Sequence, residues 1–423
     1  MTEITGLGKP GSLLSDEQVE MLLYTAFDKI DLGGKRVLII IPDGTRTAPV
    51  FFFFKALCDL LAAKTAKLDF IIALGTHPPM DEAAIETLLG MSTKERRERY
   101  PNVTVFNHSW KDPQALTTIG VITAEEASQI SNGRLSIEVP VTVNKAVLDY
   151  DHLVVCGPVF PHEVAGFSGG NKYFFPGISG AEVIDFSHWL GALETSYATI
   201  GIKNTPVRRT IDRVAGMIDR PKTAICMVTT TDGLAGLYIG NIQQAWEKAA
   251  ELSSKVHIRY VQKPFRQVLS IIPRMYDDLW TGAKGMYKLE PVIADGGEVI
   301  IYAPHIDEVS YVHGKIIDEI GYHIRDYFVA QWDKFKDYPW GILAHSTHLR
   351  GMGTYQNGVE RPRIRVTLAT GIPRERCERI NLGYRDPASI DITAWKTRQS
   401  QTSDILVVPH AGEMLYRLKG KRH

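Results

Sequence analysis

The 423-residue sequence predicts an α/β protein made of two α/β domains with mainly parallel sheets and a cleft between them. Two observations support this prediction. Strand-like runs such as 35–41 and 68–74 are apolar along almost their whole length, which is typical of parallel strands covered on both faces. Helix-like segments separate several of these runs, and the chain is longer than one hydrophobic core normally supports.

The first half of the chain alternates helix and strand signals. Ser15 begins a helical pattern, which ends at the glycine pair 33–34. The apolar run 35–41 follows as a strand, and a helix is expected over 51–61. Further strands are expected at 68–74, 103–106 and 153–155.

The second half predicts a separate α/β unit. A helix-like segment at 241–254 precedes strand-like runs at 268–272, 298–302 and 365–368. The run 404–412 predicts one more strand, which we expect to return to the first domain. These signals give an N-terminal domain over 1–262, completed by 404–423, and a C-terminal domain over 263–403.

Composition argues against several classes of function. The 48 Lys and Arg residues balance 48 Asp and Glu residues, so no electrostatic footprint for nucleic acid or an anionic membrane is expected. No apolar run has the length of a membrane span, and the N-terminus lacks the pattern of an export signal. Cys58, Cys156 and Cys226 lie in apolar contexts, while Cys377 is distant from all three. We therefore expect a cytoplasmic protein with reduced thiols and no nucleic-acid or membrane partner.

Polar side chains follow the predicted strands of the first domain. Asp43, Thr45 and Arg46 come after the first long strand. His77 follows the second strand, and His162 follows the strand near 153–155. Ligands of open α/β sheets bind beyond the carboxyl ends of the strands, so we expect these side chains to converge on one cleft.

These residue types suit acid–base chemistry on an anionic substrate. Arg46 can bind a carboxylate or phosphate through two parallel hydrogen bonds. Asp43 can instead cap a helix and form a surface ion pair, which is the simpler alternative. A single histidine such as His77 is more often structural, but a pair with His162 can serve both faces of a substrate.

The stretch 162–188 has the most specific pattern in the chain. A bend containing Ser168, Gly169 and Gly170 precedes Lys172, and His188 ends the stretch. Glycines allow backbone N–H groups to approach an anion, and a lysine there can pair with phosphate or act as a nucleophile. The flanking Asn and Tyr exclude a P-loop, which leaves a cofactor-bearing lysine or a solvated lysine on a surface turn.

Some candidates lie in the second half. Lys284 can reach an anionic substrate or be an ordinary exposed lysine. His345 and His348 are spaced like metal ligands on one helix face, but no acidic residue completes the zinc-protease pattern, so they can instead line a polar substrate pocket. The histidines at 305, 313 and 323 are expected in scattered surface or loop positions.

Together these motifs resemble those of the nickel-dependent lactate racemase family. The resemblance rests on the segments 42–46, 75–77 and 162–188, and it is looser in the second half. It implies a nickel pincer nucleotide, a pyridinium-3-thioamide-5-thiocarboxylic acid mononucleotide with nickel, attached covalently at Lys172. His188 is then the implied nickel ligand, since planar coordination with soft sulfur donors suits nickel. The implied cofactor contacts are Asp43, Thr45, Arg46, Ser168, Gly169 and Gly170.

The resemblance also implies a reaction. A racemase or epimerase of this family inverts C2 of a 2-hydroxy acid by reversible hydride transfer to the cofactor, through a planar 2-keto acid. His77 and His162 are the implied bases, one for each enantiomer, and Arg46 and Lys284 are implied substrate contacts. Enzymes that make the cofactor are implied partners.

One departure from the family concerns the substrate. Thr281 stands where lactate racemase has a glutamine, three residues before the second-domain lysine. The polar string 346–350, with Tyr355 and Gln356 nearby, predicts a substrate larger or more hydroxylated than lactate.

Other functions remain open at this stage. Lys172 can form a Schiff base in an aldolase or lyase. A non-catalytic carrier of the nickel cofactor is a third reading, although a carrier needs no pair of bases. A divalent-metal hydrolase is also possible, but the sequence offers no convincing cluster of carboxylates and histidines.

Overall fold

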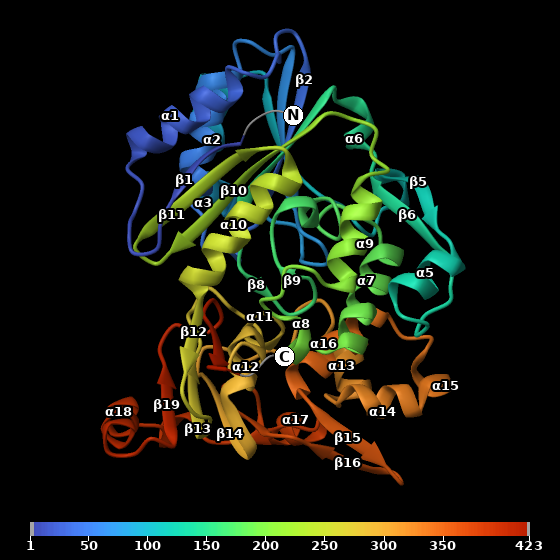
Figure 1. The fold of residues 1–423 in the computed structure, drawn as a ribbon, viewed down its shortest axis with the longest axis vertical. Helices are drawn as coiled ribbons and strands as arrows, with labels where there is room; N and C mark the ends of the chain where they lie inside the picture. The colour runs from blue at the N-terminus through green and yellow to red at the C-terminus, as the bar shows by residue number, and fades with distance from the viewer. Residues whose placement is uncertain (1–3, 421–423) are drawn as a thin grey trace. The chain divides into compact units, whose positions relative to one another are not determined.

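The computed structural model describes residues 4–420, and the chain divides into two compact units (Figure 1). Unit 1 contains the described residues up to Phe160, together with Phe167–Ile184 and Arg208–Val256. Unit 2 contains Pro161–Gly166, Asp185–Val207 and the described residues from His257 onward.

Unit 1 is built on a seven-stranded sheet with the order β1-β11-β10-β7-β2-β3-β4. The five strands from β10 to β4 are parallel to one another, whereas β11 and β1 add antiparallel at one edge. The strands are β1 (Thr5–Gly8), β2 (Arg36–Pro42), β3 (Lys67–Ala73), β4 (Val103–Asn107), β7 (His152–Pro158), β10 (Lys222–Thr230) and β11 (Gly233–Gly240).

The central strand β2 shows why this sheet is parallel and buried. Alternate side chains point to opposite faces of a strand. Ile39 and Ile41 pack in the core with the helices α1 (Asp16–Phe27), α2 (Val50–Leu61) and α3 (Glu82–Leu89). Leu38 and Ile40 are fully buried on the other face. Both faces are therefore covered, as the continuous apolar run predicted.

Several helices of unit 1 begin at a side-chain cap. Ser15 and Gln18 form a reciprocal capping box at the start of α1, as expected for this pattern. The helices are α1 (Asp16–Phe27), α2 (Val50–Leu61), α3 (Glu82–Leu89), α4 (Thr93–Arg99), α5 (Ala124–Ile130), α6 (Ala146–Asp149) and α10 (Ile242–His257). A hairpin of β5 (Leu116–Ile122) and β6 (Val139–Asn144) and the short 3-10 helices η1 (Pro113–Ala115) and η2 (Gly170–Tyr173) complete it.

Three further elements occur where the chain alternates between the units. They are α7 (Ala181–Glu194), α8 (Ser196–Thr199) and α9 (Pro206–Ala215). A two-stranded sheet of β8 (Pro161–His162) and β9 (Gly166–Phe167) precedes them.

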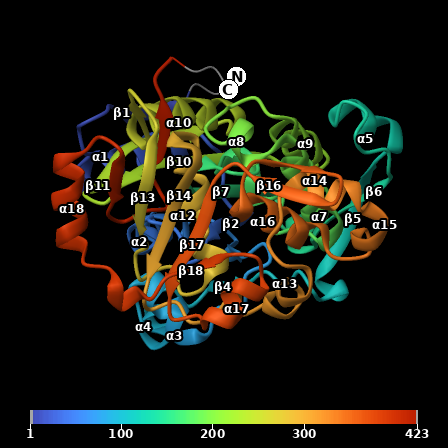
Figure 2. The same ribbon diagram turned by 90° about the horizontal axis from the view of Figure 1, so that it is seen from below.

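Unit 2 contains a five-stranded sheet with the order β18-β17-β14-β13-β19, and every neighbouring pair is parallel. Figure 2 shows β13, β14 and β17 side by side. The strands are β13 (Phe265–Ile271), β14 (Ile293–Ala303), β17 (Arg365–Thr370), β18 (Gly383–Tyr384) and β19 (Ile405–Val408). Two smaller sheets pair β12 (Ile258–Val261) with β20 (Leu415–Leu418), and β15 (Gly353–Gln356) with β16 (Val359–Pro362).

The helices of unit 2 are mostly short. They are α11 (Leu279–Gly282), α12 (Lys284–Tyr287), α13 (Gly314–Ile320), α14 (Arg325–Ala330), α15 (Trp332–Phe335), α16 (Trp340–Arg350), α17 (Arg374–Arg379) and α18 (Ile392–Gln401), with 3-10 turns η3 (Glu290–Val292) and η4 (Pro387–Ser389). The longest of these helices is α16, which packs against α12 and α13.

The expected α/β class with mainly parallel sheets is confirmed, but the expected extent of the first domain is wrong. The strand predicted at 404–412 does not return to the first sheet, because β19 pairs with the free edge of β13 in unit 2. Residues 161–166 and 185–207 also belong to unit 2, where the guanidinium of Arg417 donates to the carbonyl of Ile200. Of the predicted segment 404–423, the last three residues lie outside the described part, and the predicted cleft stays a prediction.

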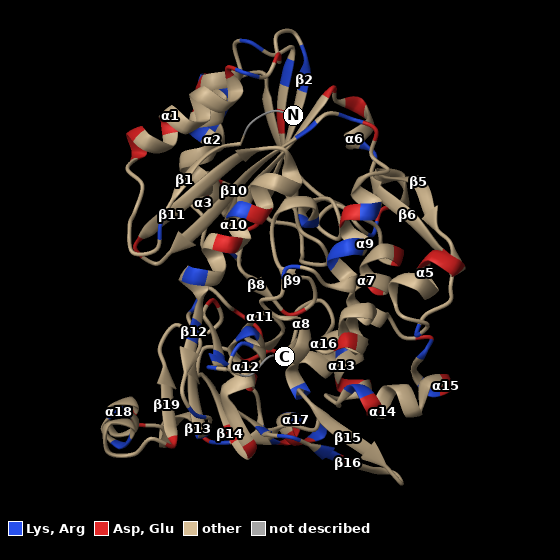
Figure 3. Cartoon of the chain, in the orientation of Figure 1, with Lys and Arg blue, Asp and Glu red and all other residues tan. Residues whose placement is uncertain are grey.

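Charged residues and cysteines occur in both units. Figure 3 shows acidic and basic residues mixed within each unit. Cys58, Cys156, Cys226 and Cys377 are all buried and form no disulfide. Within residues 4–420, no helix combines the length and the apolar character that a bilayer crossing requires.

Two buried histidines of unit 1 make the stability of the fold sensitive to acid. Burial lowers the pKa of His108 and of His152 from 6.5 to about 4. Both imidazoles still find hydrogen-bonding partners, at the Ser179 carbonyl (3.0 Å) and the Thr223 hydroxyl (2.8 Å) respectively.

We expect the free energy of unfolding to decrease as the pH falls from about 6.5 towards 4, because unfolded histidines bind protons in this range while the folded ones stay neutral. Each histidine contributes at most about 1.4 kcal/mol per pH unit. Urea unfolding at several pH values measures the slope, which His152→Gln should reduce. An unchanged slope in both His108→Gln and His152→Gln contradicts this explanation.

Candidate active site

Asp43 and His77 meet at the carboxyl ends of two neighbouring parallel strands. β2 and β3 are in register, with Pro42 opposite Ala73, so the loops that follow them start side by side. Asp43 Oδ2 lies 2.5 Å from His77 Nδ1. The other carboxylate oxygen, Oδ1, accepts hydrogen bonds from the backbone N–H and the hydroxyl of Thr45, at 3.1 and 2.7 Å.

This arrangement keeps Asp43 ionised. Asp43 is buried, and burial alone would raise its pKa. The charges of His77 and Arg46 and the hydrogen bonds from His77 and Thr45 outweigh burial and hold the pKa of the Asp43 carboxyl well below its usual value. A carboxylate at Nδ1 favours the tautomer in which Nδ1 carries the proton, which leaves Nε2 of His77 as the basic atom. The alternative in which Asp43 only caps a helix is therefore wrong.

Arg46 lies in the same loop. Its Nη1 atom donates to the carbonyl and the hydroxyl of Thr45, at 3.2 and 3.0 Å. Its positive charge acts on both Asp43 and Tyr173. Burial raises the pKa of Tyr173 well above its usual value despite this charge, so Tyr173 is a neutral phenol directly after Lys172.

The turn that carries Lys172 packs against the same strand ends. The 3-10 helix η2 contacts β2 and β7, which are adjacent in the sheet at the point where the strand order changes direction. A Cβ atom on Gly157 would lie 1.8 Å from Tyr173 Oη, so the turn approaches β7 this closely only because residue 157 is glycine. The N–H of Gly75 also donates to the carbonyl of Gly177, at 2.9 Å. In unit 1, Asp43, Arg46 and His77 thus lie at the strand ends, and the Lys172 turn contacts β2 and β7. Their expected convergence with His162, which belongs to unit 2, stays a prediction.

A clamp that sequence reasoning missed holds the loop before Lys172. The buried guanidinium of Arg208 donates to the carbonyls of Phe167 (2.5 Å) and Gly169 (3.4 Å) and lies 4.2 Å from the ring centroid of Trp246. Trp246 Nε1 in turn donates to the Ser168 carbonyl at 2.9 Å. Burial lowers the pKa of Arg208 to about 10, although Asp212 opposes the shift, and Arg208 stays charged at neutral pH.

The side chains of the loop itself have structural uses. Ser168 Oγ accepts the N–H of Phe160 (2.8 Å) and donates to the carbonyl of Pro158 (3.2 Å). Gly169 has a φ of +78°, and a Cβ there would lie 2.6 Å from Val159 Cγ2. Gly170 has a φ of +60°. These residues fix the path of the chain, and their predicted contact with a phosphate stays a prediction.

Unit 2 contains the other candidate residues. His162 is nearly buried, and its Nδ1 atom accepts the N–H of Val164 at 3.1 Å and lies 3.4 Å from Glu163 Oε2. Nδ1 is therefore the acceptor atom of the ring in this arrangement. His188, half-buried on α7, acts electrostatically on His348 of α16.

Lys284 is the first residue of α12, and Thr281 lies in α11. The Nζ atom of Lys284 lies 4.2 Å from the ring centroid of Tyr276, a favourable cation–π contact. The hydroxyl of Thr281 donates to Asp278 Oδ1 at 2.8 Å. Thr281 therefore stabilises the N-terminus of α11.

The described residues contain no preformed metal site. Within the part of the chain that the structure describes, no group of three or more His, Cys, Asp or Glu side chains is arranged to hold a metal ion. The implied role of His188, on α7, as a nickel ligand stays a prediction.

Comparison with known proteins decides the family. Residues 21–201 match the lactate racemase N-terminal domain. The chain is 27% identical over 281 residues to a lactate racemase of Thermoanaerobacterium thermosaccharolyticum, and 26% identical over 163 residues to one of Lactiplantibacillus plantarum. The chain belongs to the lactate racemase-like family. These alignments cover 65% and 38% of this chain, and 61% and 34% of the two relatives.

Solved structures share the fold of this chain. A Thermotoga maritima protein of known crystal structure is 35% identical, with a TM-score of 0.89 over 97% of this chain and 100% of that one. The lactate racemase apoprotein of Thermoanaerobacterium thermosaccharolyticum has a TM-score of 0.69 at 20% identity, over 98% of this chain and 100% of that one. The second similarity is one of fold.

Replacing Arg208 tests the loop clamp. Arg208→Met leaves the carbonyls of Phe167 and Gly169 without their donors, so we expect a loss of about 2 kcal/mol in the free energy of unfolding. Hydrogen exchange in residues 167–171 should accelerate. The matched control is Arg209→Met, because Arg209 is exposed on the same helix. Equal effects of the two substitutions would show that the clamp does not hold the loop.

Proposed function

We propose that this protein is a racemase or epimerase that inverts C2 of a 2-hydroxy acid, with a nickel pincer nucleotide attached at Lys172. The observation that carries the proposal is the Asp43–His77 pair beside the Lys172 turn, in a member of the lactate racemase-like family. The name of the relatives gives the class of substrate, and the residues of this chain give the roles that follow.

The chemistry requires both a hydride acceptor and a base. The hydrogen on the carbinol carbon of a 2-hydroxy acid is poorly acidic, so removal as a proton is difficult. When bound, the cofactor supplies an acceptor for this hydrogen as hydride. Nε2 of His77 takes the hydroxyl proton of one enantiomer, and His162 takes that of the other. The 2-keto acid is planar at C2, so either enantiomer can re-form.

Asp43 prepares His77 for this role. The carboxylate holds Nδ1, fixes the ring and stabilises the imidazolium that forms when Nε2 accepts a proton. Thr45 holds the carboxylate through its backbone and hydroxyl. We infer that Asp43 and Thr45 act mainly through His77, whereas the resemblance assigned them to the cofactor.

The remaining residues bind anions and the metal. We propose that Arg46 and Lys284 bind the substrate carboxylate, where their positive charge also polarises the reacting group. His188 would supply an imidazole to nickel, and the loop of Ser168, Gly169 and Gly170 would hold the nucleotide phosphate. Enzymes that make the cofactor are the proposed partners. A cytoplasmic location is supported by the four buried thiols, which form no disulfide.

Intact-mass analysis tests the attachment site. Protein produced together with the cofactor-making enzymes should carry a covalent adduct and nickel, both lost in Lys172→Ala. Lys203→Ala, a change of an exposed lysine, is the control and should keep both. Adduct and nickel at unchanged levels in Lys172→Ala contradict the proposal. Trapping of a carbonyl compound at Lys172 by borohydride, without nickel, would instead favour a Schiff-base aldolase or lyase.

Replacing the bases tests the mechanism. His77→Ala and His162→Ala should each abolish inversion of C2 while nickel stays bound. Asp43→Asn should reduce turnover by roughly 100-fold or more, because an amide no longer fixes the tautomer of His77. Chiral chromatography measures inversion, and His410→Ala, at an exposed position, is the control. Unchanged turnover in either histidine variant removes that histidine from the mechanism. If the loaded protein with both histidines intact inverts no 2-hydroxy acid, the result would support a non-catalytic carrier of the cofactor.

A further inference from the structure

Unit 2 contains buried polar atoms that have no partner. His348, on α16, is 3% exposed, and neither of its ring nitrogens makes a hydrogen bond within the described residues. The hydroxyl of Tyr322, a fully buried residue, also has no partner there. Leaving such a group unsatisfied costs about 1–3 kcal/mol, so these atoms require an explanation.

His345 joins this group. It lies one helical turn before His348, and its Nε2 atom is fixed by the carbonyl of Trp280 at 3.0 Å, while Nδ1 has no partner in the described chain. Its ring stacks on Trp280, with centroids 3.7 Å apart and planes at 7°. The Tyr322 ring centroid is 5.8 Å from that of His345. Trp280, His345 and Tyr322 therefore form one aromatic surface, with His348 beside it.

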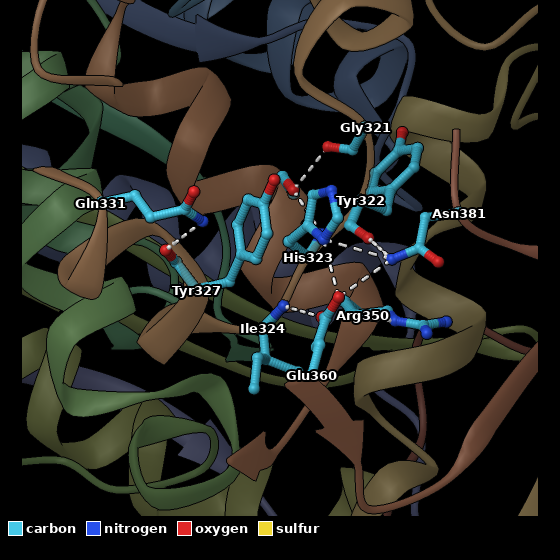
Figure 4. Close-up of polar contacts among 10 residues, drawn as sticks. Gly321, Tyr322, His323, Ile324, Tyr327, Gln331, Arg350, Glu360 and Asn381 are labelled. Atoms are coloured by element: carbon cyan, nitrogen blue, oxygen red, sulfur yellow. Dashed lines mark hydrogen bonds and ion pairs between the residues drawn. The ribbon is translucent and has the colours of Figure 1, made fainter. Parts of the chain in front are cut away.

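Several polar groups on and around α16 do have partners, although Arg350 Nε makes no hydrogen bond within the described residues (Figure 4). Ser346 Oγ donates to the carbonyl of Gly321 and accepts the N–H of His323, at 2.8 and 2.9 Å. Glu360 accepts from His323 Nδ1 at 2.7 Å and lies 3.8 Å from Arg350 at the end of the helix. His323 lies in a loop, as expected, and the structure adds that it belongs to this network.

The same network fixes the backbone of Tyr322 and leaves its hydroxyl apart. Asn381 Nδ2 donates to the carbonyl of Tyr322 at 2.9 Å and to Glu360 Oε2 at 3.1 Å. Figure 4 shows the ring of Tyr322 pointing away from Glu360. The backbone of Tyr322 is therefore fixed while its hydroxyl makes no hydrogen bond in the described chain, as expected of a side chain that binds a ligand.

The unsatisfied atoms lie near the substrate contacts that we propose for unit 2. The charge of Glu163, which adjoins His162, acts on both His345 and His348. Trp280 precedes Lys284 at the start of the neighbouring helix, and α12 packs on α16. His345 and His348 thus lie within reach of the charge beside His162, and α16, which carries both, packs on the helix that begins with Lys284.

Both histidines are uncharged at neutral pH. Burial lowers the pKa of His345 to about 3 and that of His348 to about 4, although Glu163 opposes both shifts. A neutral imidazole offers one donor and one acceptor, and a phenol can do both. Such groups match hydroxyls, which donate and accept, better than a second carboxylate, which only accepts.

We propose that Tyr322, His345 and His348 form a subsite for the hydroxylated chain of the substrate, which is a polyhydroxylated 2-hydroxy acid of the aldonate class. This proposal rests on the proposed function. The methyl group of lactate would leave all four atoms unpaired. A dicarboxylic acid would need a further cation, and Arg350 is already paired with Glu360.

The test compares substrates that differ in their hydroxyl groups. Loaded protein should invert a six-carbon aldonate such as gluconate with a kcat/KM at least 100-fold above that for lactate, because sites built for a hydroxyl discriminate strongly against its absence. Glycerate, which is lactate with one added hydroxyl, should fall between them. Tyr322→Phe and His348→Leu should each reduce the ratio of kcat/KM for gluconate to that for lactate by at least tenfold.

Two controls separate binding from structure. Tyr338→Phe removes a hydroxyl that faces Glu319 and should leave the ratio unchanged. Tyr322→Phe removes a hydroxyl with no partner, so it should be at least as stable as the unaltered protein in urea unfolding, whereas a structural role would make it less stable. Nickel content is measured for every variant.

The outcomes distinguish the two proposals. Inversion of lactate at a higher kcat/KM than gluconate, or an unchanged ratio in both variants, overturns the subsite and leaves the racemase proposal standing. Should the loaded protein invert no acid, the racemase proposal fails, and binding of gluconate to the protein by ligand-observed NMR decides the subsite. Weaker binding in Tyr322→Phe and His348→Leu supports it, and equal binding overturns it.

Discussion

The hydrogen bond between Asp43 and His77 joins the ends of two parallel strands, and the candidate chemistry of unit 1 is arranged around it. Parallel pairing of β2 and β3 brings two loops to one edge of the sheet although their residues are 34 positions apart in the chain. Burial of the pair lowers the local dielectric and strengthens the attraction between carboxylate and imidazole. One partly buried interaction therefore sets the ionisation of Asp43 and the tautomer of His77, and it joins the two loops.

Buried polar groups divide into two kinds in this protein. Arg208 and Trp246 satisfy the carbonyls of the loop before Lys172, and Glu360 satisfies three donors around α16. The free energy of desolvating these groups is offset inside the protein, which makes their segments rigid. His348 and Tyr322 lack such compensation in the described chain. Rigid surroundings and unsatisfied atoms together are typical of a binding site, where a ligand completes the hydrogen bonds.

Membership of the lactate racemase-like family and the chemistry of these residues support one another. The candidate residues are distributed over both units, with Asp43, Arg46, His77 and Lys172 in unit 1. His162, His188 and Lys284 belong to unit 2. Differences in substrate among relatives are then expected to come from side chains such as His348, while the strand ends keep their chemistry.

The sequence by itself determined the α/β class, most of the strands and the side chains at the ends of β2 and β3, because continuous apolar runs and the residues after them are local signals. It also marked Lys172 through the glycines around it. Tertiary structure decided the rest. The sequence did not reveal that β19 adds to β13, that Arg208 reaches Phe167 or that His323 pairs with Glu360, because each depends on residues far apart in the chain. Likewise, a histidine that lacks a partner looks like any other in sequence, and only packing shows which atoms are left unsatisfied.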